Sequence, residues 1–443
     1  MPTFTLLCEN YKGDKKTLYY DTEHSTLVDE KGIDIVKPRA LEERVKKLPS
    51  KAYDKNNPAV KSDKIKVLKI SLGLSCNYSC SYCSQRFVPE ADNMNKAWVD
   101  NFIKRLDTWF WGGYNKKGSG VHIELWGGEP FVYWKTIQPL VAGLKEKYPN
   151  LTFSTITNAS LLDDEKVDWI IENLNSISIS HDGVGYHLRG EDPLDKPEIK
   201  KHIMRLYRTL APQQRISINP MLNKENMSRK AIQEFLEKVF DDGNLVLGEG
   251  GFIDAYDEGA VAVSLTGETD RINFRRMAIH EIRNNQASRF AIVKQKISSF
   301  VSSLVNRIEK NTVIQKCGID QEDNLIVDLR GNVITCQNVS SNATAPNGNS
   351  HKVGSVYDYE NIKLNTVKSW QNRANCFKCP VLHLCQGSCT FLEDDLFQKS
   401  CDNSFSDNVV FLAAAVEKLT GYLPVKIIGE HRKDRHDIWG LGI

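Results

Sequence analysis

Three cysteines lie within eight residues, in the stretch Cys76-Asn-Tyr-Ser-Cys80-Ser-Tyr-Cys83. The stretch directly follows an apolar, β-branched run, residues 65–72, which predicts a strand. All three thiols can turn toward one point if the backbone loops around it. Thiolates select zinc and iron–sulfur centres over hard cations. Because zinc needs a fourth ligand and none stands at a matching local spacing, the pattern favours an iron–sulfur cluster with one open iron.

The chain of 443 residues is long enough for about two to three domains. Its net charge of +2 gives no global attraction to nucleic acid or membranes, although nucleic acid is not excluded. No apolar run approaches the roughly 20 residues that span a bilayer, and residues 1–8 lack the pattern of a signal peptide. We therefore expect a cytoplasmic protein with no membrane partner. The odd count of eleven cysteines then indicates metal or redox use rather than disulfides.

From residue 65 the hydrophobic pattern alternates between strands and helices, which is typical of a parallel α/β sheet. Polar residues and glycines follow the strands, where α/β barrels build their sites. The predicted fold class is α/β, a partial (β/α)6 barrel similar to a TIM barrel, with a small β-containing N-terminal extension and a cysteine-rich C-terminal domain. The expected strands are 65–72, 121–125, 151–156, 177–180, 216–220 and 245–247. The expected helices are 95–110, 134–147, 164–173, 198–210 and 228–239.

The pattern Cys-x3-Cys-x-aromatic-Cys after a first strand resembles the radical S-adenosylmethionine (SAM) enzymes, with Tyr82 at the aromatic position. In that family the three cysteines hold a four-iron cluster whose open iron chelates SAM. An electron then cleaves SAM to a 5′-deoxyadenosyl radical, which abstracts hydrogen from a substrate. The resemblance implies that Cys76, Cys80 and Cys83 are the catalytic cluster ligands. The alternative is three unrelated buried or zinc-binding cysteines.

The turn Gly127-Gly128-Glu129-Pro130 follows the second strand and carries a further resemblance. Its glycines let backbone carbonyls approach a ligand without a Cβ in the way, and in the family this turn receives the amino group of SAM. Arg189 resembles a basic residue near the SAM carboxylate, with a surface salt bridge as the alternative. The strand ends at which the family contacts SAM carry Thr157, Asn158, Ser180 and Asp182.

Seven more cysteines cluster between residues 317 and 401, and their order resembles the SPASM (or twitch) extension of radical SAM proteins. That extension houses two auxiliary iron–sulfur clusters. No cysteine stands between residues 317 and 336, so the nearer cluster would have three thiolates and either an open iron or a non-cysteine ligand. Two zinc sites are the alternative. By position, the distal set is Cys376, Cys379, Cys385 and Cys401, and the nearer set is Cys317, Cys336 and Cys389.

The resemblance implies a radical SAM/SPASM oxidoreductase that oxidises or crosslinks a residue in a ribosomally made precursor peptide. Its cofactors would be SAM and three [4Fe-4S] clusters, and its electron donor a protein such as flavodoxin or ferredoxin. Sulfatase-maturing relatives use an acidic base where this chain has Gln337, which argues against that branch. A nucleotide, nucleic-acid base or small metabolite is the alternative substrate. A zinc-stabilised interaction protein is the remote alternative.

Five segments are expected along the chain. They are an N-terminal extension with a lysine-rich linker (1–64), the barrel (65–255), bridging helices (256–311), the SPASM domain (312–403), and a C-terminal helix and tail (404–443). Cys8 is expected to lie in the core of the first segment. The charged residues from Arg432 to His436 predict a solvated end.

Overall fold

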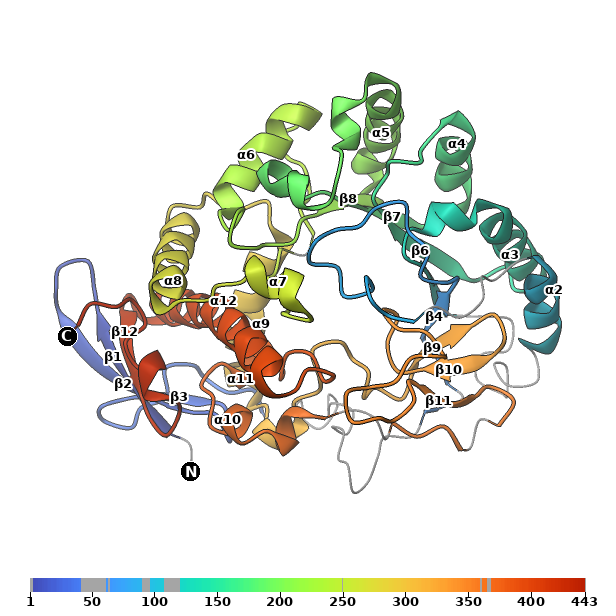
Figure 1. Ribbon diagram of the computed structural model, residues 1–443. Coiled ribbons are helices and arrows are strands. Elements are labelled where there is room, and N and C mark those ends of the chain that lie inside the picture. The colour runs from blue at the N-terminus through green and yellow to red at the C-terminus, as the bar shows by residue number, and fades with distance from the viewer. Residues whose placement is uncertain are drawn as a thin grey trace.

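Two β-sheets organise the protein, as the computed structural model shows (Figure 1). The structure describes residues 3–40, 61–62, 64–89, 96–106, 120–248, 250–358, 361–364 and 368–442. Most of the predicted linker, residues 45–64, lies outside them. The strands are β1 (Thr3–Glu9), β2 (Lys15–Asp21), β3 (Thr26–Asp29), β4 (Val67–Ser71), β5 (His122–Trp126), β6 (Thr152–Thr157), β7 (Ser176–Ser180), β8 (Ile216–Asn219), β9 (Asn324–Asp328), β10 (Asn332–Ile334), β11 (Lys352–Ser355) and β12 (Leu423–Ile428).

Helices cover one side of the larger sheet and fill the space between the two sheets (Figure 1). The α-helices are α2 (Lys96–Arg105), α3 (Trp134–Lys147), α4 (Asp164–Asn173), α5 (Pro197–Leu210), α6 (Arg229–Phe240), α7 (Glu258–Ala262), α8 (Glu268–Arg283), α9 (Ala291–Asn306), α10 (Ala374–Phe377), α11 (Leu382–Cys385) and α12 (Asp394–Thr420). None of the described helices is long and apolar enough to cross a membrane.

The larger sheet has the order β11-β10-β9-β4-β5-β6-β7-β8, and β9 and β4 to β8 run parallel. The prediction of alternating strands and helices is confirmed for β4 to β8 and for the helices between them. The predicted sixth strand, 245–247, is wrong. Leu247 makes isolated parallel bridges to Ile218 on one side and to Phe290 on the other, and these single-residue bridges do not extend into a strand.

The two faces of the parallel sheet differ in polarity. Side chains such as Leu68, Ile70 and Ile123 point to the helix-covered face and are fully buried. Their neighbours Lys69 and Glu124 point to the inner face, where they form an ion pair at 2.9 Å and keep partial exposure. The alternation is that of strands with one face under helices and one face wet. Closed α/β barrels instead fill this space with branched apolar side chains, so the partial barrel has a polar interior.

The cysteine-rich C-terminal segment inserts a strand into the barrel sheet. Strand β9 pairs in parallel with β4, with Val67 opposite Asn324 and Ser71 opposite Asp328. This pairing places the end of β9 beside the end of β4, from which the cysteine loop begins. Residues more than two hundred positions apart in sequence therefore meet at one sheet edge.

The smaller sheet joins the two ends of the chain. Its order is β12-β1-β2-β3, and β12 pairs with β1 in the antiparallel direction. The helix predicted at the start of residues 404–443 is confirmed, but α12 begins ten residues earlier, at Asp394, and so carries Cys401. The predicted solvated end is wrong, because Arg435 is only 6% exposed.

Candidate functional site

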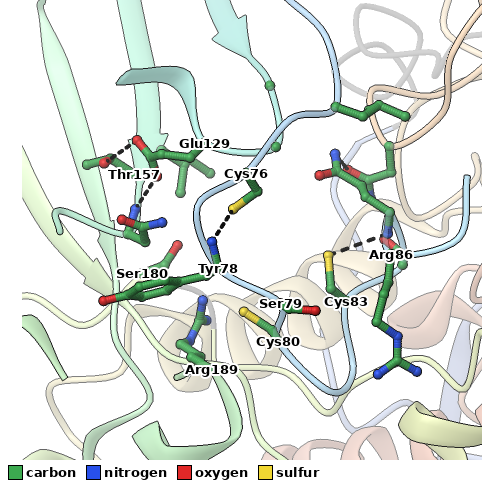
Figure 2. A pocket seen from close by; sticks show the side chains of 18 of the residues that line it. Cys76, Tyr78, Ser79, Cys80, Cys83, Arg86, Glu129, Thr157, Ser180 and Arg189 are labelled. Atoms are coloured by element: carbon green, nitrogen blue, oxygen red, sulfur yellow. Dashed lines mark hydrogen bonds between the residues drawn. The ribbon is translucent and has the colours of Figure 1, made fainter. Parts of the chain in front are cut away.

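A cavity of about 360 Å³ opens at the carboxyl ends of β4 to β7, where parallel sheets bind ligands. Figure 2 shows the sulfur atoms of Cys76, Cys80 and Cys83 around the inner side of one loop at this cavity. Tyr82, Pro130 and Asp182 do not line it. The other predicted residues that do are Gly127, Gly128, Glu129, Thr157, Asn158, Ser180 and Arg189.

The three thiols of the cysteine loop lie close together and have backbone N–H groups beside them. Burial raises the pKa of Cys80 to about 11, Arg189 opposes this rise, and charges on Cys83 and Cys76 add to it. The three sulfurs are therefore close enough to feel one another's charge. The backbone N–H of Tyr78 donates to Cys76 Sγ at 3.3 Å, and that of Gln85 donates to Cys83 Sγ at 3.4 Å. Hydrogen bonds of this kind favour the charged form of a ligand sulfur.

The glycine turn is fastened to the start of the cysteine loop. Gly128 donates its N–H to the carbonyl of Gly73 at 3.1 Å, and Glu129 donates to that of Ser75 at 3.0 Å. A Cβ on Gly128 would stand 2.3 Å from the carbonyl oxygen of Leu74. Only glycine permits this close approach, so the turn and the three thiols keep a fixed relative position.

Glu129 holds the turn from inside the protein. Its carboxylate accepts hydrogen bonds from the Thr157 hydroxyl and the Asn158 N–H, both at 2.7 Å (Figure 2). It also accepts from the Phe131 N–H at 3.1 Å. Burial raises its pKa to about 7 although these donors oppose the rise. Because the carboxylate is only 1% exposed and fully engaged, this side chain positions the turn.

A buried network supports Arg189 at the cavity wall. Arg189 donates to Asp182 Oδ1 at 2.9 Å, and the Tyr82 hydroxyl also donates to the Asp182 carboxylate. Met221 adds its N–H to the same carboxylate at 2.9 Å. Tyr82 and Asp182 thus lie behind Arg189. The Nε of Arg189 is buried without a hydrogen-bond partner among the described residues.

Several of the seven C-terminal cysteines influence one another's pKa. Burial raises the pKa of Cys376, and charges on Cys401, Cys385 and Cys379 raise it further. Burial likewise raises the pKa of Cys389 to about 12, and Asp254, Cys336 and Cys317 add to it. No cysteine of one set is among the named causes of the pKa shift of Cys376 or Cys389 in the other set. Cys8 lies apart in β1, 2% exposed, with its Sγ donating to the Leu6 carbonyl.

The N–H···S pattern of the first loop recurs in both C-terminal sets. The N–H of Asn338 donates to Cys336 Sγ at 3.4 Å. The backbone groups two residues further along also lower the pKa of four other cysteines, Cys317, Cys379, Cys385 and Cys389. The residues two positions after these cysteines share no common type, so the sequence alone does not predict the pattern.

Three further features near the site were not anticipated. Asn338 lines the cavity and accepts a hydrogen bond from the Gln85 amide at 3.3 Å, which links the cysteine loop to the residues after Cys336. The ion pair of Lys69 and Glu124 lies one layer below the cavity, and Trp126 donates to Glu124 at 2.9 Å. Buried arginines stand beside the distal set, with Arg435 Nη2 3.3 Å from Cys401 Sγ.

The arrangement of the cysteine side chains indicates which kind of metal centre they can hold. Among the described residues, no three His, Cys, Asp or Glu side chains are drawn together as they would be around a single ion. A four-iron cluster takes one thiolate at each separate iron, so its ligands need not converge on one point. Coupled thiols with N–H donors beside a cavity fit such a cluster. A partial barrel whose cysteine loop, residues 76–83, lines the cavity is the arrangement expected of enzymes that bind a cofactor on a cysteine-held cluster.

Comparison with known proteins identifies the family. Residues 70–236 match the family model described as the radical SAM superfamily. Over 176 residues the chain is 24% identical to an S-adenosylmethionine-dependent nucleotide dehydratase of Psychrobacter lutiphocae. The matched region covers 37% of this chain and 58% of that protein. The chain therefore matches less than two thirds of the length of this curated relative. Residues 70–236 are therefore similar to the radical SAM enzymes.

Solved structures share the fold. The structure of native anSMEcpe with bound AdoMet matches with a TM-score of 0.56 and 16% identity, over 80% of this chain and 98% of that one. Native anSMEcpe with AdoMet and the Cp18Cys peptide matches with a TM-score of 0.55 and 16% identity, over 80% and 97%. The likeness extends well beyond residues 70–236, so the fold of anSMEcpe includes counterparts of the C-terminal segment.

Proposed function

We propose that the protein is a SAM-cleaving oxidoreductase that abstracts hydrogen from an unactivated carbon of a peptide substrate. A reduced [4Fe-4S] cluster held by Cys76, Cys80 and Cys83 would supply the electron that cleaves SAM to a 5′-deoxyadenosyl radical. The observation that carries this proposal is the shared cavity, which unites the three thiols with the glycine turn and Arg189.

The residues of the cavity have separate tasks in this proposal. The N–H donors to Cys76 and Cys83 stabilise the thiolates for cluster binding. The turn at Gly128 offers backbone groups to the amino end of SAM, because no Cβ blocks the approach. Arg189, fixed by Asp182, presents a cation to the SAM carboxylate.

We propose that the C-terminal sets hold two auxiliary [4Fe-4S] clusters. Mutual coupling of the thiols within each set and the recurring N–H···S bonds support this assignment. The nearer set contributes three thiols, and the link from Gln85 to Asn338 places it next to the SAM cavity. It is therefore suited to exchange an electron with a substrate at the cavity, and a flavodoxin or ferredoxin would serve as external donor.

The charge balance of the cavity supports a peptide over a nucleoside triphosphate. The two cations that line its described wall, Arg86 and Arg189, are each paired with a carboxylate, Asp257 at 3.2 Å and Asp182 at 2.9 Å. A triphosphate carries several negative charges and needs cations that are not already compensated. The anSMEcpe structure with the Cp18Cys peptide shows that this fold admits a peptide in that protein. The nucleotide dehydratase relative favours a nucleotide as the second candidate.

Anaerobic reconstitution with iron and sulfide, followed by a dithionite assay for 5′-deoxyadenosine, tests the chemistry. We expect about twelve irons per chain, four in each of three clusters, and SAM cleavage that Cys80→Ala abolishes while the auxiliary iron remains. Cys8→Ala is the matched control, because Cys8 is buried in β1 away from every set, and it should retain both iron and activity. Zinc in place of iron, or full iron without SAM cleavage, would contradict the proposal.

The substrate class is tested in the same assay. Candidate precursor peptides and the common nucleoside triphosphates are added separately, and both 5′-deoxyadenosine and modified product are measured by mass spectrometry. A peptide that gains mass-shifted product supports the proposal. Product formed from a nucleotide and from no peptide would establish the second candidate instead.

A further inference from the structure

The C-terminal tail folds back over the distal set of cysteines. After β12 the chain turns, and the short 3-10 helix Lys433–Arg435 returns it toward α12. Ile427 donates its N–H to the carbonyl of His436 at 2.9 Å, and the Trp439 indole donates to that of Pro424 at 2.8 Å. The tail is thus fixed on both sides of Arg435, which is only 6% exposed.

The Arg435 guanidinium contacts a sulfur of the distal set. Its Nη2 lies 3.3 Å from Cys401 Sγ and 2.7 Å from Asp402 Oδ1, and its carbon lies 4.5 Å from the centre of the Phe405 ring. Asp402 also accepts from Arg432 at 2.9 Å. Because Phe405 lies four residues after Cys401 and three after Asp402, the three side chains gather on one side of α12, and the guanidinium is held against that side.

The positive charge of Arg435 acts on Cys379 as well as on Cys401. Burial raises the pKa of Cys379 to about 12, and Arg435 is the strongest of the groups that oppose this rise. A [4Fe-4S] core with four thiolates carries net negative charge, and reduction makes it more negative. A fixed neighbouring cation and a hydrogen bond to a ligand sulfur both favour the reduced form.

We propose that Arg435 is a positioning residue for the distal cluster, which raises its reduction potential through the bond to Cys401 Sγ and closes the site against solvent. This inference rests on the proposed function, because it needs a cluster at the distal set. It assigns a role to the last residues of the chain, which lie far from the SAM cavity in sequence. The conservative replacement by lysine keeps the charge but loses the planar contact.

The test is a redox titration of the reconstituted full-length protein, followed by electron paramagnetic resonance. The distal signal is identified as the one that Cys379→Ser removes. In Arg435→Met we expect the ratio of reduced to oxidised distal cluster to fall roughly tenfold at a fixed ambient potential, which is about 59 mV for one electron. Arg435→Lys should fall between this variant and the wild type.

Arg432→Met is the matched control, since Arg432 shares Asp402 with Arg435 and lies apart from the described thiols. It should leave the distal potential unchanged, and the SAM-binding cluster should be unchanged in every variant. An unchanged distal potential in Arg435→Met at full iron content overturns the inference. If that variant does not fold, the potential of Arg435→Lys decides in the same way. A wild type without distal iron overturns this inference and the assignment of auxiliary clusters, and 5′-deoxyadenosine formation then shows whether the SAM site stands.

Discussion

Replacement of Glu129 by glutamine tests how the glycine turn is held. The carboxylate is 1% exposed and accepts from Thr157, Asn158 and Phe131. Two of these donors share Oε1, and the Asn158 N–H uses Oε2. A glutamine can accept the first two through its carbonyl, but its NH₂ then meets the Asn158 N–H. At pH 5 the wild type carries the protonated acid, because its pKa is about 7, and both of its oxygens can still accept a hydrogen bond. The glutamine NH₂ cannot, and a buried donor without an acceptor costs about 1–3 kcal/mol, so we expect the variant to be less stable at pH 5.

The pH dependence of this loss follows from the raised pKa. Burial raises the pKa of Glu129 from the ordinary 4.5 to about 7, so the folded protein binds this proton more tightly than the unfolded chain. The resulting stabilisation is fully present below pH 4.5 and is lost as the pH rises through 7. A change of this size corresponds to about 3 kcal/mol. Glutamine does not titrate, so the wild type should lose most of its advantage between pH 5 and pH 8.

Urea unfolding at both pH values, followed by tryptophan fluorescence, measures this difference. The midpoint of the wild type should move closer to that of Glu129→Gln as the pH rises. Glu172→Gln, at an exposed position of α4, is the control and should show a gap near zero at both pH values. A stability gap for Glu129→Gln that is equal at pH 5 and pH 8 would refute the argument.

Two further substitutions probe the cavity wall. Gly128→Ala places a Cβ 2.3 Å from the Leu74 carbonyl oxygen, and the forced separation should cost about 1–3 kcal/mol of unfolding free energy and abolish SAM binding. Gly243→Ala is the control, because a Cβ there meets open space. Equal SAM binding by the two variants would contradict the role of the turn. Arg189→Met removes the proposed charge-assisted bond to the SAM carboxylate, which is worth about 1.5–3 kcal/mol. Equilibrium dialysis should therefore show SAM binding weakened by roughly ten- to a hundredfold, with partial recovery in Arg189→Lys. Undiminished binding would remove Arg189 from the SAM site.

Local patterns predicted the barrel well because its elements are determined locally. The helix 134–147 and the N-cap at Ser228, which accepts from the Ala231 N–H, follow from periodicity and from side-chain chemistry within a few residues. The cysteine loop and the glycine turn were predictable for a similar reason, since each follows a strand. Strands at the same edge of a parallel sheet bring their ends together whatever the intervening helices contain.

Pairings between distant segments were beyond this reasoning. Strand β9 is five residues of ordinary β-branched and apolar character, and nothing in it names β4 as its neighbour. The failure at 245–247 is of the same kind, because those residues have strand-like side chains but pair with Ile218 and Phe290 only through isolated bridges at Leu247. Register and partner are set by tertiary packing, which a single-sequence pattern does not contain.

The charged tail shows most clearly why composition misleads here. A run of arginine, lysine and aspartate is typical of a solvated end, and Arg432 does remain partly exposed. Arg435 differs only in what it meets, a carboxylate at 2.7 Å and a sulfur at 3.3 Å. Burial of a guanidinium is tolerable where such acceptors compensate its charge. The acceptors are residues 401 and 402, so the burial of Arg435 depends on α12, and a change in either partner should be felt by the other.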